Sequence, residues 1–79
     1  MSDEIKTVLD LRGLLCPMPV VKLAKAIKGM AVGELVQATA SDPGVLADIP
    51  AWCKSTGNEL VKMEKDDKVF VFVVRKLAG

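Results

Sequence analysis

The sequence predicts a two-layer α/β sandwich in which two helices cover one face of a four-stranded sheet. Strand-like and helix-like segments follow one another in the order β-α-β-α-β-β. Right-handed crossovers between such strands place both helices on the same face. The 79 residues suit one small domain, expected over 1–79 with an ordered core at about 5–76.

The first half of the chain is expected to form a strand, a helix and a second strand. The strands are Ile5 to Leu11 and Glu34 to Ala40. The helix, from about Pro17 to Lys28, could begin at Pro17 or at Pro19, because both fit a first turn and Pro19 disfavours helical geometry in the residue before it. Its apolar residues have the i, i+3, i+4, i+7 spacing of one stripe: Val20, Leu23, Ala24 and Ile27.

The next segment combines a helical face with an internal proline. Ser41 to Gly44 has the character of a loop that starts a helix. Pro50 must either kink the helix that follows or mark a restart capped by Asp48. Gly57 is the expected stop. The residues expected on one face are Val45, Leu46, Ile49, Trp52 and Cys53.

The chain then reads as a β-hairpin. Leu60 to Glu64 is the third strand and Lys65 to Lys68 the polar turn. Val69 to Arg75 is almost continuously apolar, which is typical of a central strand. Either its phenylalanines or its valines must face away from the helices, as ordinary exposed surface or as a dimer or partner surface.

Charge and residue usage exclude several classes of function. A net charge of +1 gives no bulk attraction to nucleic acid. Histidine is absent, so a Cys-His catalytic pair cannot form, and two cysteines are too few for a zinc site. No apolar run is long enough to span a membrane, and the polar start is unlike a signal peptide. We expect a cytoplasmic protein without a cofactor.

The segment Cys16-Pro17-Met18-Pro19 stands between the first strand and the first helix. A sulfur ahead of the first helical turn lies at the positive end of the helix dipole, which favours the reactive thiolate. The two prolines stiffen the backbone around it. If Cys16 caps the helix, Met18 supplies the amide that can reach its sulfur, because Pro19 has none.

Two further features each have a structural and a functional interpretation. From Leu11 to Gly33 the chain contains cations and no acid, which indicates either a solvated helix face or a basic surface for an acidic partner. Cys53 and Trp52 fall on the expected core face, so Cys53 is interpreted as a small buried hydrophobe rather than a resolving thiol. The cations are Arg12, Lys22, Lys25 and Lys28.

The segment Leu9-Asp10-Leu11-Arg12-Gly13-Leu14-Leu15-Cys16-Pro17-Met18-Pro19 resembles the Cys-Pro-x-Pro signature of the TusA (SirA-like) sulfur carrier proteins. The resemblance continues through Ser41-Asp42-Pro43, Asp48 to Cys53 and Gly57 to Leu60. It implies a mixed four-stranded sheet and a persulfide carrier. Such a carrier accepts sulfur from a cysteine desulfurase, a rhodanese or a related carrier, and passes it to an acceptor protein.

The resemblance also implies roles for individual residues. Cys16 would accept the sulfur, and Met18 fills the variable position of the motif. Lys22 and Lys25 could steer an acidic donor into place. The other residues of the motif and its surroundings are Asp10, Arg12, Gly13, Pro17, Pro19 and Asp42. The pathways that the family implies are tRNA thiolation, molybdenum-cofactor assembly and sulfur oxidation, and the expected state is a monomer or weak dimer.

Two other functions remain open from the residues. The same topology resembles an RNA-binding domain of a bacterial translation initiation factor, which would make the protein an RNA- or protein-binding regulatory module. Near-neutral charge and few aromatics weigh against direct nucleic-acid binding. A thiol redox sensor built on Cys16 and Cys53 is disfavoured, because one thiol is expected to be exposed and the other buried.

Overall fold

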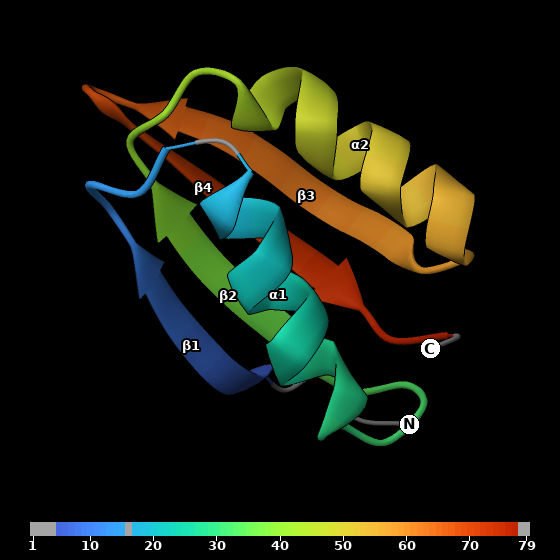
Figure 1. Ribbon diagram of the computed structural model, residues 1–79. Helices are drawn as coiled ribbons and strands as arrows, with labels where there is room; N and C mark the ends of the chain where they lie inside the picture. The colour runs from blue at the N-terminus through green and yellow to red at the C-terminus, as the bar shows by residue number, and fades with distance from the viewer. Residues whose placement is uncertain (1–4, 16, 78–79) are drawn as a thin grey trace.

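Figure 1 shows the computed structural model of the protein, which describes residues 5–15 and 17–77. The element order is β-α-β-α-β-β, which confirms the predicted fold class. The elements are β1 (Ile5–Leu11), α1 (Met18–Lys28), β2 (Leu35–Ala40), α2 (Val45–Thr56), β3 (Glu59–Asp66) and β4 (Val69–Arg75).

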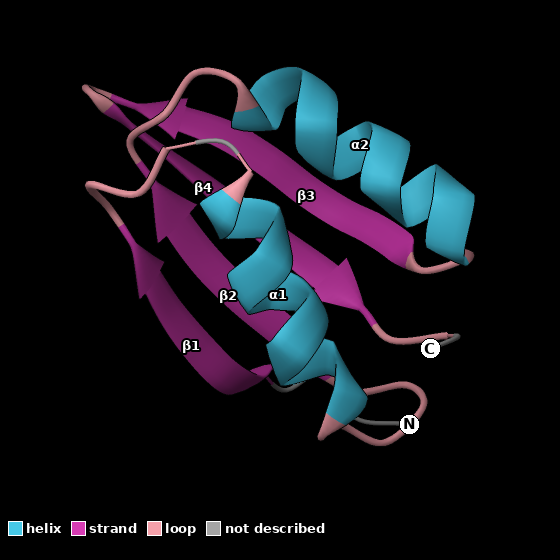
Figure 2. Ribbon diagram, in the orientation of Figure 1, coloured by secondary structure: helices cyan, strands magenta, loops and turns pink. Residues whose placement is uncertain are grey.

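The four strands form one mixed sheet in the order β1-β2-β4-β3. Strand β1 runs parallel to β2, whereas β4 is antiparallel to both β2 and β3. Both helices lie on the same face of the sheet (Figure 2). The predicted central position of β4 is confirmed, and its near-continuous apolar sequence reflects its place between β2 and β3.

The hydrophobic core fills the space between the helices and the sheet. Phe72 and Val74 of β4, Leu23 and Ile27 of α1 and Ile49 of α2 are all fully buried. Burying a side chain of this size stabilises the fold by about 1.5–3 kcal/mol. The two helices are therefore held to the sheet by a few large aliphatic and aromatic contacts.

Helix α1 begins at Met18, between the two alternatives that the prolines left open. Pro17 is the N-cap residue and Pro19 lies in the first turn, where its missing N–H costs no helical hydrogen bond. Pro19 is fully buried together with Leu23 and Ile27, while Val20 and Ala24 are only half-buried. The buried stripe is thus rotated toward Pro19, which anchors the start of the helix in the core.

Helix α2 is continuous from Val45 to Thr56 with Pro50 inside it, so of the two alternatives, a kink or a restart capped by Asp48, the restart does not occur. Asp48 lies in the first turn of this single helix. The prediction that Leu46 faces the core is wrong, because its side chain is 48% exposed. The buried face consists of Val45, Ile49 and Cys53, which are spaced four residues apart. Leu46 follows Val45 directly and therefore points in another direction. Gly57 ends the helix at φ +81°, as predicted.

The β3–β4 hairpin is tighter than the sequence predicted. Asp67 adopts a left-handed backbone conformation with φ +57°, which aspartate tolerates better than most residues. The turn is therefore confined to Asp67 and Lys68. Lys65 and Asp66, expected in the turn, pair instead with Phe70 and Val69 as part of β3.

The face of the sheet opposite the helices carries Val71 and Val73 of β4, whereas Phe70, Phe72 and Val74 point into the core. Val73 is buried although no helix covers it, while Val71 is half-buried. Their partners on the neighbouring strands are polar, and on β3 the Lys62 Nζ and Glu64 Oε2 atoms lie 3.4 Å apart. Long polar side chains therefore accompany the valines on this face.

Within residues 5–15 and 17–77, neither helix has the length and apolar character needed to cross a membrane.

Candidate functional site

The loop between β1 and α1 is tied to the end of β2 by one hydrogen bond. The backbone N–H of Gly13 donates to Oγ of Ser41 over 2.8 Å. Gly13 has φ +81°, a conformation that favours glycine, and a methyl group added to it would meet no atom within 4 Å. Glycine is therefore favoured here by the positive φ of the backbone, and not by a close contact with a neighbouring segment.

The predicted acceptor, Cys16, lies outside the described residues. The residues on either side of it, Leu15 and Pro17, are exposed, and Leu15 is 72% exposed. The N-cap residue of α1 is Pro17. The Met18 N–H donates to the Leu15 carbonyl over 2.8 Å, so this amide is already committed to the turn.

The start of α1 is electrostatically suited to an anion. Its N-cap proline offers no capping side chain, and its first turn contains no acidic residue. Helical N–H groups without partners carry partial positive charge, and no carboxylate of the helix neutralises it. A sulfur anion brought to this end of α1 would be stabilised.

Asp10 and Arg12 form a bidentate ion pair at the end of β1. Arg12 Nε donates to Asp10 Oδ1 over 2.8 Å, and an Arg12 terminal nitrogen donates to Oδ2 over 3.0 Å. The backbone N–H of Arg12 adds a bond of 3.2 Å to the same Oδ1. The hydrogen bonds from the Arg12 side chain, with that from its backbone, lower the pKa of Asp10 to about 2.

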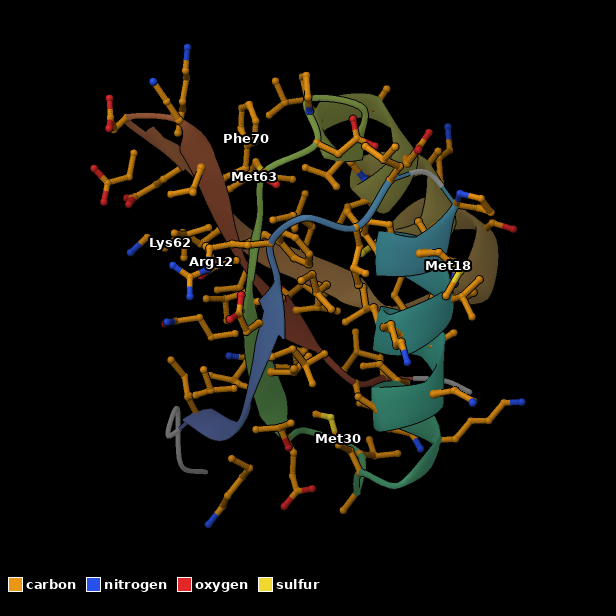
Figure 3. All side chains as sticks on the ribbon, turned by 60° about the vertical axis from the view of Figure 1, so that its left-hand side comes forward. Arg12, Met18, Met30, Lys62, Met63 and Phe70 are labelled. Atoms are coloured by element: carbon orange, nitrogen blue, oxygen red, sulfur yellow. The ribbon has the colours of Figure 1, made fainter. Side chains whose placement is uncertain are left out.

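This ion pair lies on the helix-free side of the sheet. Figure 3 shows Arg12 on that side, while Met18 lies on α1 on the opposite side. Arg12 is fully committed to Asp10 as a forked pair, which fixes its direction. The side chains of Asp10 and Arg12 are therefore separated by the sheet from α1.

The predicted docking cations lie along α1, with Lys22 near its middle and Lys25 in its last turn. Lys22 and Lys25 are exposed on the helix, and Met18 and Val21 beside them are 40% and 41% exposed. With Leu15 they form a mixed surface, here called the α1 surface, of apolar side chains flanked by positive charge. The apolar members of this surface were not predicted from the sequence. Val21 could have been, because its position in the helical repeat places it outside the stripe of core residues.

Asp42 lies in the loop between β2 and α2 and stabilises its conformation. Its Oδ1 accepts a hydrogen bond of 3.0 Å from the Gly44 N–H, and its carbonyl accepts one of 3.1 Å from the Val45 N–H. These two bonds start α2. Ser41, just before Asp42, anchors the loop between β1 and α1 through its bond to Gly13. It was not predicted as a site residue. Its position directly after a strand parallel to β1 is the signal that could have indicated it.

Cys53 and Trp52 lie on the inner side of α2. Cys53 is 3% exposed, and its removal from water raises the pKa of its thiol to about 11. Trp52 is half-buried against the core. The interpretation of Cys53 as a buried hydrophobe is thus supported by its place in the core. No group of three or more potential metal-binding side chains occurs among the residues that the structure describes.

Comparison with known proteins identifies the family to which this arrangement belongs. Residues 7–76 match the family described as Sulfurtransferase TusA. The chain belongs to the TusA family. It is 41% identical over 70 residues to a putative sulfur carrier protein of Archaeoglobus fulgidus, covering 89% of this chain and 96% of that one. It is 35% identical over 78 residues to the sulfur carrier protein TusA of Pseudomonas aeruginosa PAO1, covering 99% of each.

Other TusA family relatives differ in length. The chain is 44% identical over 69 residues to the putative sulfur carrier protein YrkF of Bacillus subtilis, covering 87% of this chain but only 37% of that protein. The crystal structure of a SirA-like protein from Desulfitobacterium hafniense superposes with a TM-score of 0.77, covering 90% of this chain and 97% of that one. Its sequence identity is 21%, so the likeness bears on the fold alone.

Proposed function

We propose that the protein is a sulfur carrier that accepts sulfane sulfur as a persulfide on Cys16 and relays it to an acceptor protein. The observation that carries the proposal is the position of Cys16 in the chain. It lies between two exposed residues, directly before the uncapped and acid-free start of α1. Membership of the TusA family and the names of the relatives support the same function.

The proposed reaction is a thiol exchange in which atoms and charge balance. The Cys16 thiolate attacks the outer sulfur of a donor cysteine persulfide, the sulfur–sulfur bond of the donor breaks, and the donor cysteine leaves as a thiolate. Cys16 then holds the sulfane sulfur, and an acceptor thiolate or an enzyme-bound substrate removes it by the same kind of attack. No general base is needed, because the attacking group is already an anion.

The α1 surface is the proposed docking site for the donor and acceptor proteins. Lys22 and Lys25 steer an acidic partner, and Leu15, Met18 and Val21 provide apolar contact close to Cys16. Asp10, Arg12, Gly13 and Asp42 act indirectly in this proposal, because their hydrogen bonds shape the two loops beside α1. Pro17 and Pro19 hold the start of the helix itself.

The partners are proposed by class. The donor is a cysteine desulfurase, a rhodanese or a related carrier, because each presents a protein-bound persulfide to attack. The acceptor serves tRNA thiolation, molybdenum-cofactor assembly or sulfur oxidation. Direct binding of nucleic acid is not part of the proposal, since the net charge of +1 gives little attraction to phosphates.

Mass spectrometry of the full chain, after incubation with a protein persulfide donor, tests the proposal. We expect the native protein and the Cys53→Ser variant to gain one sulfur atom that a reductant removes, and the Cys16→Ser variant to gain none. Circular dichroism confirms that each variant is folded. Loading that survives in Cys16→Ser, or that disappears only in Cys53→Ser, would contradict the assignment of Cys16.

A further inference from the structure

The two edges of the sheet are protected to different degrees. Edge strand β3 carries five charged residues among its eight and a bulge between Leu60 and Lys62, features that discourage pairing with another chain. Edge strand β1 has only Lys6 and Asp10 as charged residues and contains no proline. Its irregularity is confined to the Ile5–Thr7 end, and Val8 at its centre is 70% exposed.

The sequence of β1 is self-complementary about Val8. If two copies pair antiparallel with Val8 opposite Val8, each Lys6, at the register shift where the regular part of β1 begins, is brought toward Asp10 of the other copy. The same register sets Thr7 opposite Leu9, within the regular part of β1. The two exposed valines would cover one another, and two opposite-charge pairs would form by symmetry.

The surface beside Val8 can receive the partner's Lys6. A shallow hollow of about 210 Å³ is lined by Val8, Leu9, Asp10, Arg12 and Thr39. A lysine stem can lie along its apolar part while the ammonium reaches the Asp10 carboxylate. That carboxylate accepts three hydrogen bonds, all from Arg12, and a carboxylate has about four acceptor sites.

We propose that β1 is a homodimer interface, through which two copies form one continuous eight-stranded sheet. A two-fold axis perpendicular to the sheet keeps the helices of both copies on one face. Strand β1 forms the outer margin of the sheet and no helix lies beyond it, so the partner strand can approach (Figure 1). Antiparallel pairing sends the loops that follow Leu11 to opposite ends, which keeps the two α1 surfaces accessible.

A charge exchange between Lys6 and Asp10 tests the register of the interface. The full chain and its variants are studied by sedimentation over a concentration series. We expect the native chain to dimerise, and Lys6→Glu and Asp10→Lys each to weaken the dimer at least about tenfold, because each replaces two attractions by two repulsions. An equimolar mixture of the two variants restores the dimer, since opposite charges again face each other.

Two further variants keep the test decisive. Val8→Lys places two ammonium groups together at the centre and should abolish the dimer, and its high exposure means that the fold tolerates it. Glu64→Lys, on the opposite edge of the sheet, should leave the dimer unchanged. Circular dichroism checks that all variants fold. A native chain that stays monomeric, a dimer that survives Val8→Lys, or a mixture that fails to associate would overturn the proposal.

Discussion

The Gly13 backbone N–H and the Ser41 side chain, 28 residues apart in sequence, are joined by a hydrogen bond of 2.8 Å. The bond exists because β1 and β2 are parallel neighbours, with Leu11 opposite Ala40, so the residues that follow both strands leave the sheet side by side. It ties the loop that precedes α1 to the loop that starts α2. The proposed carrier cysteine therefore follows a loop whose backbone is anchored at Gly13.

We expect Ser41→Ala to lower the free energy of unfolding by about 1 kcal/mol, the typical contribution of such a hydrogen bond. Ser41→Thr should retain most of the stability, because it keeps the accepting hydroxyl. Denaturant unfolding of the three proteins measures the difference. Equal stability of the alanine and serine proteins would show that the bond contributes nothing.

We expect Gly13→Ala to destabilise the protein by about 1–2 kcal/mol, through backbone strain at positive φ rather than through collision. A Cβ at this position meets no atom within 4 Å outside Gly13 and its two chain neighbours, so the cost arises in the local backbone. Gly13→Asn should cost less than Gly13→Ala, since asparagine adopts this conformation more readily. Thermal unfolding ranks the two variants, and the reverse order would contradict the argument.

The Asp10 carboxyl should titrate with a pKa of about 2, because Arg12 donates hydrogen bonds to its charged form. The folded-state pKa lies below the ordinary value, so this pair contributes stability above about pH 4 and loses it as the pH falls toward 2. NMR titration of the carboxyl carbon measures the pKa. In Arg12→Ala the pKa should return toward its ordinary value of 3.8, and an unchanged pKa would exclude Arg12 as the cause.

Cys53 should resist alkylation in the folded protein, since its thiol is buried and burial raises its pKa to about 11. The unfolded chain ionises first, at a pKa near 9.0, so this group makes stability fall as the pH rises from about 9 to about 11. The Cys16→Ser variant contains Cys53 as its only cysteine. Iodoacetamide labelling of that variant should be slow in buffer and fast in denaturant. Fast labelling of the folded chain at pH 8 would place the thiol at the surface.

Charge reversal of Lys22 and Lys25 should slow sulfur transfer from an acidic donor, and the effect should shrink as salt is added. Both cations are exposed on α1, where long-range attraction is screened within about 10 Å at 0.1 M salt. Lys54→Glu on α2 is the matched control and should change the rate little. Stopped-flow transfer rates across a salt series measure this. A slowing independent of salt would indicate lost contacts rather than lost steering.

Much of the fold follows from local patterns in the sequence. The bounds of β1 and β4 were predicted as observed, because alternating and continuous apolar runs bounded by turns define a strand. Gly57 marked the end of α2 for a similarly local reason, since its left-handed conformation suits glycine. One uncertainty came where two local signals conflicted. Pro50 suggested an interruption, but the buried residues on either side of it keep one continuous helix.

The candidate site divides in the same way. Some features around Cys16 can be taken from the sequence alone. These are the two prolines that follow the cysteine and the absence of an acidic residue from the first turn of α1. The contact of Ser41 with Gly13 cannot, because it depends on which strands are neighbours. The side of the sheet on which the Asp10–Arg12 pair lies cannot either, because it depends on which face of β1 the helices cover. The orientation of β4 was likewise open in the sequence, and in the tertiary structure Phe70 and Phe72 point inward while Val71 and Val73 point outward.

The sequence by itself determined the order of the elements and predicted the segment that presents a reactive thiol, because both depend on residues close together in the chain. Only the tertiary structure decided that Ser41 anchors that segment, that Arg12 turns to the helix-free side, and that β1 stands at an unprotected edge. Each of these depends on pairing between distant strands. Strand pairing depends on the hydrophobic burial of the whole core, and each short segment of the sequence contributes only part of that burial.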